Sequence, residues 1–176
     1  MNIYTSRLNL RPVSKNDLQA VHDLHLLPQT NEFNTLGVPK NIIATQEIIK
    51  NWVKNNELTI PKSHTFVIET TLEKQFVGLI GINLGKEKYK NAEVWFKIHP
   101  LFWNNGFATE SLKAVLEFGF QELKLHRIEA GCAIENTSSV KVLEKVGMQR
   151  EAHTRKLLPL ATGWSDNYGY AILSTD

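Results

Sequence analysis

The sequence predicts one mixed α/β domain with a central meander of strands. Three observations support this prediction: two amphipathic helical segments come early, three β-rich segments follow, and helices then alternate with strands to the end of the chain. The chain has 176 residues, 42% of them hydrophobic, which is enough to bury one sizeable core. We expect a single domain over residues 1–176, without repeats, linkers or low-complexity segments.

The first third of the chain is expected to fold as strand, helix, loop and helix. Residues Leu8–Pro12 alternate apolar and polar side chains, as a half-buried strand does. Residues 14–17 resemble a capping box, with Asp17 in place of the usual Glu, and start a helix that ends before Pro28. The polar residues 29–40 predict a loop. The apolar face of the second helix consists of Ile48, Ile49, Trp52 and Val53.

Three segments rich in β-branched and aromatic residues then predict a meander of strands. They are His64–Thr70, Phe76–Asn83 and Ala92–Ile98, joined by turns at residues 72–75 and 85–91. The second segment is apolar throughout from Val77 to Ile82, as a central strand buried on both faces would be.

The rest of the chain alternates helices and strands. A helix is expected from the turn at residues 103–106 to about Leu123, because apolar residues recur there at helical spacing. These residues are Ala108, Leu112, Val115, Leu116, Gly119 and Phe120. The remaining segments are a strand over Arg127–Ile134, a short helix over Asn136–Val146 closed by Gly147, and two strands over Gln149–Leu157 and Asn167–Leu173.

Residues Trp103–Glu110 are the most informative segment, because they join a strand to a helix through a tight turn that contains Gly106. The first N–H groups of a helix are unpaired, and the helix dipole adds roughly half a positive charge there. The chain contains neither G-x-x-x-x-G-K-[ST] nor G-x-G-x-x-G. The segment therefore predicts a pyrophosphate cradle built from backbone N–H groups. The alternative is an ordinary helix start in a strand–helix unit.

Composition and charge exclude several classes of partner. The 20 basic and 18 acidic residues give a net charge of +2, and the basic residues are scattered, so we expect no nucleic-acid partner. The lone cysteine, Cys132, fits a reducing cytosol and is expected to be buried and inert. No signal pattern and no apolar run of transmembrane length occurs, so we expect a cytoplasmic protein with no membrane partner. His22 and His25 are interpreted as surface residues, since no third metal ligand accompanies them.

Separated motifs along nearly the whole chain resemble the GNAT superfamily of acetyl-CoA-dependent N-acetyltransferases, in its RimJ/RimL-like branch. Their order and spacing together are specific. The motifs are Ser6–Pro12 with Asp17, Ala92–Ile98, Trp103–Glu110, Asn136–Met148, and Gly163–Asp166 with Tyr170. The resemblance implies a GNAT fold, with a mixed, mostly antiparallel, twisted sheet of about seven strands flanked by about four helices. It also implies acetyl-CoA as co-substrate without a metal, and a possible homodimer through the last strands.

The resemblance further implies which residues contact the cofactor. A backbone N–H between Trp95 and Ile98, splayed by a bulge, would bind the thioester oxygen. Asn104 departs from the family pattern by replacing a glycine, and Leu143 stands where many relatives have the tyrosine that protonates the thiolate. The implied cofactor-contacting residues are Ile98, Asn104, Asn105, Gly106, Phe107, Ala108, Thr109, Asn136 and Ser139.

Two residues are candidates for catalysis. Glu93 would act as the base, directly or through a water; the alternative is a solvent-facing residue paired with a lysine. The resemblance also implies that Ser139 would donate a proton to the thiolate. The alternative for this region is helix capping, for which Asn136 or Ser138 is a good N-cap. Trp52 is interpreted as a core residue more readily than as part of a substrate pocket.

The acceptor is expected to be a primary amine, and by family analogy the α-amine of a protein. An α-amine with a pKa of about 8 is roughly 10% neutral at pH 7, so it needs little help from a base. The alternatives are a small amine such as a polyamine, aminoglycoside or amino acid, or a non-catalytic acyl-CoA-binding module. The loop over residues 29–41 carries one acidic residue, Glu32, which gives little support for a polycationic substrate.

Overall fold

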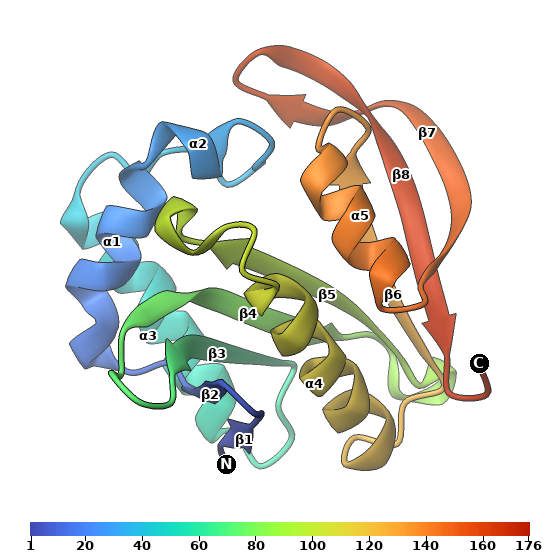
Figure 1. Cartoon of the computed structure of the whole chain (residues 1–176), viewed down its shortest axis with the longest axis horizontal. Helices are drawn as coiled ribbons and strands as arrows, with labels where there is room; N and C mark the ends of the chain where they lie inside the picture. Colours follow the sequence, from blue (N-terminus) through green and yellow to red (C-terminus); the bar gives the residue numbers. More distant parts are fainter.

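A computed structural model describes residues 1–176 and contains one eight-stranded sheet with helices on both faces (Figure 1). The strand order is β1-β2-β3-β4-β5-β6-β8-β7, and every pairing is antiparallel except β5 with β6. The strands are β1 (Ile3–Tyr4), β2 (Leu8–Pro12), β3 (Ser63–Thr70), β4 (Phe76–Leu84), β5 (Asn91–Ile98), β6 (Arg127–Ala133), β7 (Gln149–Leu160) and β8 (Gly163–Leu173). The helices are α1 (Leu18–Leu26), α2 (Pro28–Asn31), α3 (Ile42–Glu57), α4 (Phe107–Gln121) and α5 (Thr137–Lys145).

The mixed α/β fold class is confirmed, with small differences in the number and length of elements. β1 and α2 were not expected, because a strand of two residues and a helix of four show no measurable periodicity. α2 lies in the predicted loop and begins at Pro28, which suits the first position of a helix. The last hairpin is longer than expected, since β7 and β8 pair up to the turn between Leu160 and Gly163.

The start of α1 is held by the expected capping box and by an ion-pair cluster. The backbone N–H of Ser14 donates to the Asp17 carboxylate at 2.7 Å. Arg11 binds Asp17 at 2.7 Å and Glu69 of β3 at 2.9 Å, so this arginine ties the helix start to two strands. Burial opposes ionisation of Asp17, but its bonds with Arg11 and Ser14 prevail, and the pKa of this carboxyl is lowered.

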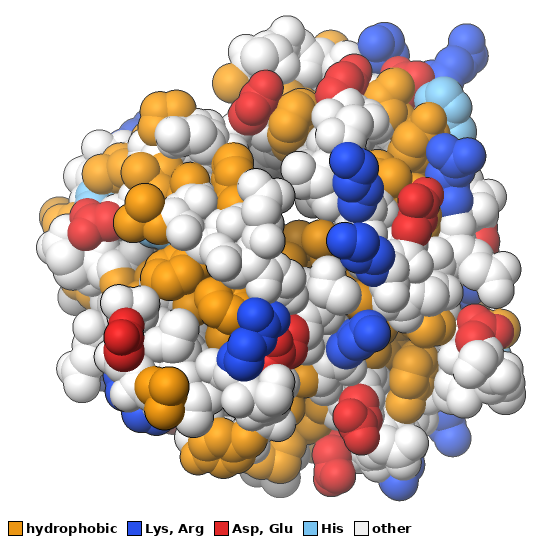
Figure 2. All heavy atoms as spheres, viewed as in Figure 1, with side chains coloured by type: hydrophobic (Ala, Val, Ile, Leu, Met, Phe, Trp, Pro, Cys, Tyr) orange, Lys and Arg blue, Asp and Glu red, His pale blue; other side chains and the backbone are white.

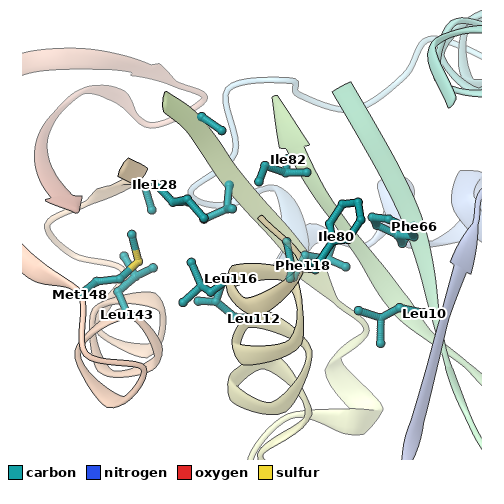
Figure 3. Packing of buried hydrophobic residues seen from close by; sticks show 14 of the residues in the cluster. Leu10, Phe66, Ile80, Ile82, Leu112, Leu116, Phe118, Ile128, Leu143 and Met148 are labelled. Atoms are coloured by element: carbon teal, nitrogen blue, oxygen red, sulfur yellow. The ribbon is translucent and has the colours of Figure 1, made fainter. Parts of the chain in front are cut away.

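The two faces of the sheet form separate hydrophobic cores. On one face, α4 and α5 pack against the strands; Figure 3 shows Leu112, Leu116 and Phe118 of α4 facing strand residues such as Ile80. On the other face, α1 and α3 cover a smaller core that contains Leu79 of β4 and has Trp95 of β5 packed against it. Side chains of a strand alternate between faces, so successive residues of β5 point into the two different cores.

The sheet opens between β5 and β6. β5 pairs with β4 over its whole length, up to Ile98 opposite Gly78. Its parallel pairing with β6 ends after Glu93 and Glu129. In Figure 1 the two strands start side by side near the C-terminus and then diverge toward α5 and the η3 turn (Pro100–Phe102). This divergence leaves an unpaired strand edge inside the sheet, between the two halves of the domain.

Gly119 tests the packing of α4 on the sheet. A Cβ at this position would lie 2.6 Å from Cδ1 of Ile128. We expect Gly119→Val to lower the free energy of unfolding by about 1–3 kcal/mol, measured by urea denaturation, because the core must expand around the new side chain. Glu117→Val places the same side chain on the exposed face of α4 and serves as the control. Equal stability of the two variants would contradict the tight α4–sheet contact.

Candidate active site

The turn before α4 presents a row of free backbone N–H groups. Gly106 has φ 78°, and Asn104 also adopts the left-handed conformation with φ 61°. Asparagine tolerates this conformation better than other non-glycine residues, which explains how it replaces a glycine here. The first helical bond runs from the N–H of Glu110 to the carbonyl of Gly106, and no N–H from Asn104 to Thr109 donates to a protein acceptor. These groups can therefore bind an anion.

Two side chains fix this turn to the sheet. The indole Nε1–H of Trp103 donates to the carbonyl of Ile98, at the end of β5, at 2.8 Å. Arg7 donates from Nη1 to the carbonyl of Asn105 at 3.0 Å, and its guanidinium lies 4.6 Å from the centre of the Phe107 ring. The sequence indicated neither bond, because the acceptor in each is a backbone carbonyl, which every residue has and no sequence motif identifies.

Glu110 holds Arg7 in place. Its carboxylate accepts hydrogen bonds from Nε of Arg7 at 2.7 Å, from the N–H of Arg7 at 3.0 Å, and from Oγ1 of Thr5 at 2.6 Å. Partial burial opposes ionisation of Glu110, but the bonds from Thr5 and Arg7 outweigh it, so the pKa of this carboxyl is lowered. The segment between β1 and β2 is thus locked onto the first turn of α4.

The open edge of β5 offers further donors. The N–H of His99 donates to Val77 of β4, so odd-numbered residues of β5 bond to β4 and even-numbered residues point toward the β6 side. The N–H groups of Phe96 and Ile98 consequently face the gap where β6 has diverged. The expected bulge in this strand is absent, since β4 and β5 pair without a register shift. Divergence of the neighbouring strand, rather than a bulge, exposes these groups.

The α5 side of the gap carries Asn136 and Ser139. The Asn136 side chain accepts a hydrogen bond from the N–H of Ser139 at 3.1 Å, so Asn136 is the N-cap of α5. Both residues are half-buried, and the Ser139 hydroxyl has no hydrogen bond within the protein. Leu143 is fully buried in the core below them, so it offers no proton donor. Figure 2 shows a hollow beside the start of α4, with basic side chains along its α5 side.

Two other titratable groups beneath α5 are held in their neutral forms. Burial, aided by the negative charge of Glu144, raises the pKa of Cys132 to about 11, which agrees with the expected buried and inert thiol. Burial also raises the pKa of Tyr170 to about 12, and its hydroxyl donates to Glu144 at 3.2 Å. Both residues belong to the core below α5.

Glu93 is exposed at the last residue pair before β5 and β6 diverge, opposite Glu129. It faces solvent, as the alternative to a catalytic role expects, but it forms no ion pair with a lysine. As an odd-numbered residue it shares the α1/α3 side of the sheet with Trp95 and Lys97.

The α1/α3 side holds polar residues whose burial the sequence did not reveal. His22 and His25, expected at the surface, are 9% and 1% exposed, so that expectation is wrong. Nδ1 of His22 is 2.7 Å from the Thr45 hydroxyl of α3. The Trp52 ring stacks on Trp95 at 5.6 Å between centres. The one sequence signal of a polar site on this side is Lys97, which lies among apolar and aromatic residues in the second half of β5.

Comparison with known proteins agrees with this geometry. The family model described as "Acetyltransferase (GNAT) domain" matches residues 7–149. An uncharacterized N-acetyltransferase of Bacillus subtilis (strain 168), YnaD, is 33% identical over 178 residues, covering 100% of this chain and 99% of the relative. The crystal structure of a GNAT-family acetyltransferase from Bacillus anthracis is 32% identical, covers 100% of both chains and superposes with a TM-score of 0.88.

A third likeness has a named substrate. The spermidine N(1)-acetyltransferase of Vibrio cholerae is 25% identical over 148 residues, covering 84% of this chain and 82% of the relative. Within this chain, no helix is both long and apolar enough to cross a membrane. No group of three or more His, Cys, Asp or Glu side chains is arranged to hold a metal ion.

The lowered pKa of Glu110 predicts how stability depends on pH. The carboxylate stabilises the fold above its unfolded-state pKa, and this contribution is lost as pH falls through the lower folded-state pKa. We expect Glu110→Gln to lower the midpoint of thermal unfolding at pH 7 by about 2–4 °C, and the difference from the parent to shrink toward pH 3. Glu117→Gln, on the exposed face of the same helix, is the control. A difference that stays constant with pH would contradict the role given to the ionised carboxylate.

Proposed function

This chain belongs to the GNAT acetyltransferase family, and on that premise we propose that it transfers the acetyl group of acetyl-CoA directly to the α-amine of a protein. The observation that carries the proposal is the pairing of two free donor sets: the N–H row from Asn104 to Thr109, and the open edge of β5 beside it. One set suits a pyrophosphate and the other an extended arm that ends in a thioester.

Acetyl-CoA fits these donors as a substrate that spans both. Its pyrophosphate would accept from the amides of Asn105 to Thr109 and benefit from the dipole of α4. Its pantetheine arm would run along the gap, between Ile98 and Asn136. The thioester oxygen would accept an N–H from the even-numbered residues of β5, a bond of the kind that is worth about 3 kcal/mol in a transition state.

The transfer needs one proton removed and one supplied. The neutral amine attacks the thioester carbon, the C–S bond breaks, and the amine proton leaves for a base. Glu93 is the base we propose, acting through a water, since it is unpaired and stands where the strands diverge. Ser139 would protonate the departing thiolate, because its hydroxyl is free and the position of the family tyrosine is taken by the buried Leu143.

An α-amine suits this site better than a polyamine does. Two carboxylates, Glu93 and Glu129, lie at the point of divergence, and Glu129 is paired with Arg127. Glu93 is therefore the one unpaired carboxylate there, which favours an acceptor whose amine has a pKa of about 8 over one near 10. The relative that acetylates spermidine keeps a small amine as the alternative acceptor. The proposal for a protein α-amine rests on the family branch that the motifs resemble, and a free amino acid shares the same α-amine chemistry.

The cradle assignment is tested by two substitutions of Gly106. A Cβ there would meet only Nη2 of Arg7 at 3.5 Å, so backbone strain, not lack of space, sets the cost. We expect Gly106→Val to weaken CoA binding at least about tenfold in calorimetry, since β-branched residues avoid positive φ. Gly106→Asn should lose less, because asparagine tolerates that conformation. Equal affinities for both variants and the parent would contradict the cradle.

Transfer itself is tested by thiol release from acetyl-CoA with peptides and small amines as acceptors. We expect thiol release with α-amine acceptors. We also expect Glu93→Gln to lower turnover and to move the pH profile of turnover upward, because without a base the reaction depends on amine that is already neutral, and neutral amine is more abundant at higher pH. Glu87→Gln, an exposed carboxylate on the η2 turn (Glu87–Tyr89), is the control. A profile of Glu93→Gln identical to the parent would remove Glu93 from the mechanism, and no release with any acceptor would refute the transferase proposal.

A further inference from the structure

Three polar side chains on the α1/α3 side are buried with polar atoms that have no protein partner. Lys97 is 7%, His25 1% and Asn31 8% exposed. The unpartnered atoms are Nζ of Lys97, Nδ1 of His25 and Oδ1 of Asn31. Native proteins rarely leave such atoms unsatisfied, and a group of them in one region indicates a site that something else completes.

These residues lie on the same side of the sheet as Glu93, the proposed base. Lys97 follows Trp95 on the same side of β5 and lies opposite Leu79 of β4, which belongs to the α1/α3 core. It stands where β5 no longer has β6 beside it. The opposite side of the sheet carries α4 and the N–H row proposed for the pyrophosphate. Lys97 is therefore separated from the phosphates by the sheet itself.

His25 of α1 is a buried polar residue that the charge of Lys97 reaches. His25 lies in the last turn of α1, with its ring 6.2 Å from that of Trp52 and edge-on to it. Asn31 of α2 donates to the carbonyl of His25 at 2.6 Å, which anchors the end of α1. Burial, together with the nearby positive charge of Lys97, lowers the pKa of His25 to about 4, so the imidazole is neutral at pH 7. The charge of Lys97 thus reaches His25, and both side chains are buried.

The lysine lacks the anion that its charge requires. Burial lowers the pKa of Lys97 to about 8. In most molecules the Lys97 side chain is therefore still charged at pH 7. A buried ammonium without an acceptor is strongly unfavourable, whereas an anion that enters with its own hydrogen-bonding oxygens relieves this cost. A polycation would instead be repelled by the same charge.

Resting on the proposed function, we propose that Lys97 binds a carboxylate of the acceptor, so that the preferred substrate carries an α-amine and a nearby carboxylate. A compact, two-oxygen anion suits one ammonium with a single neutral imidazole beside it, since Nζ donates to one oxygen and Nδ1, when protonated in the neutral tautomer, to the other. The carboxylate has two sources with the same chemistry: the α-carboxylate of a free amino acid, or an acidic side chain near the N-terminus of a peptide.

The test compares matched acceptors with the native enzyme. Free α-amino acids are paired with their α-carboxamides, and peptides that begin with Asp or Glu are paired with peptides that begin with Asn or Gln; spermidine is the cationic acceptor. For at least one pair, the amino acids or the peptides, we expect kcat/KM of the acceptors with the carboxylate to exceed that of their amide counterparts about tenfold, as one charge-assisted hydrogen bond would give. The excess over spermidine should be larger. The series that responds identifies the source of the carboxylate.

Lys97→Met then assigns the preference to this residue, because methionine fills similar volume without charge. We expect the ratio of kcat/KM for carboxylate acceptors to kcat/KM for amide acceptors to fall to within about twofold of unity, through a change in KM. The affinity for CoA, measured by calorimetry, should be unchanged. Lys54→Met, which removes an exposed lysine from α3, should keep the parent ratio. Circular dichroism checks that Lys97→Met folds; if it does not, the ratio measured in the native enzyme decides alone.

The outcomes separate this proposal from the transferase proposal. If the native enzyme acetylates amides or spermidine as well as carboxylates, or if Lys97→Met keeps the carboxylate preference, the acceptor proposal is wrong while the transferase proposal stands. An equal loss of kcat for every acceptor would also overturn it, since Lys97 would then act on the thioester and not on the acceptor. Failure of all acceptors to release thiol would refute the transferase proposal itself.

Discussion

The divergence of β5 from β6 beyond Glu93 and Glu129 is the constraint on which the rest of the structure depends. A sheet interior normally pairs every strand edge, because an unpaired N–H or C=O costs free energy when water is excluded. Here β4 holds β5 straight along its full length while β6 turns away. The N–H groups of Phe96 and Ile98 on the resulting edge are unpaired, so a ligand can accept from them as an added strand would, without first ordering a loop.

The elements around that edge divide the chemistry between the two sides of the sheet. On the α4 side, left-handed residues Asn104 and Gly106 turn the chain so that successive N–H groups point outward. Trp103 bonds this turn to the end of β5, and Arg7 with Glu110 bonds it to the N-terminal segment. On the α1/α3 side, Lys97 and His25 are buried, and the His25 ring lies edge-on to Trp52. Phosphate and acceptor carboxylate would thus reach separate positive sites with the reacting atoms between them.

The sequence predicted the parts of this arrangement that depend on local periodicity. The apolar run from Val77 to Ile82 is a central strand, and the helix after Gly106 was placed within a few residues. The two-residue β1 and the four-residue α2 are too short to show a period. The burial of His25 and Lys97 depends on contacts between α1, α3 and β5, which no local pattern encodes. The exposed edge of β5 was expected from a bulge, but it arises from long-range strand order that the sequence does not show.

The most direct test of the account is a titration of the protein with CoA, followed through backbone amide resonances by NMR. If CoA binds as described, the largest shift changes belong to the amides from Asn104 to Thr109 and to Phe96 and Ile98, because these groups gain acceptors that they lack in the free protein. Amides of β7 and of the exposed face of α3 should change little. Saturable binding whose largest changes lie outside the turn before α4 and the open edge of β5 would contradict the account.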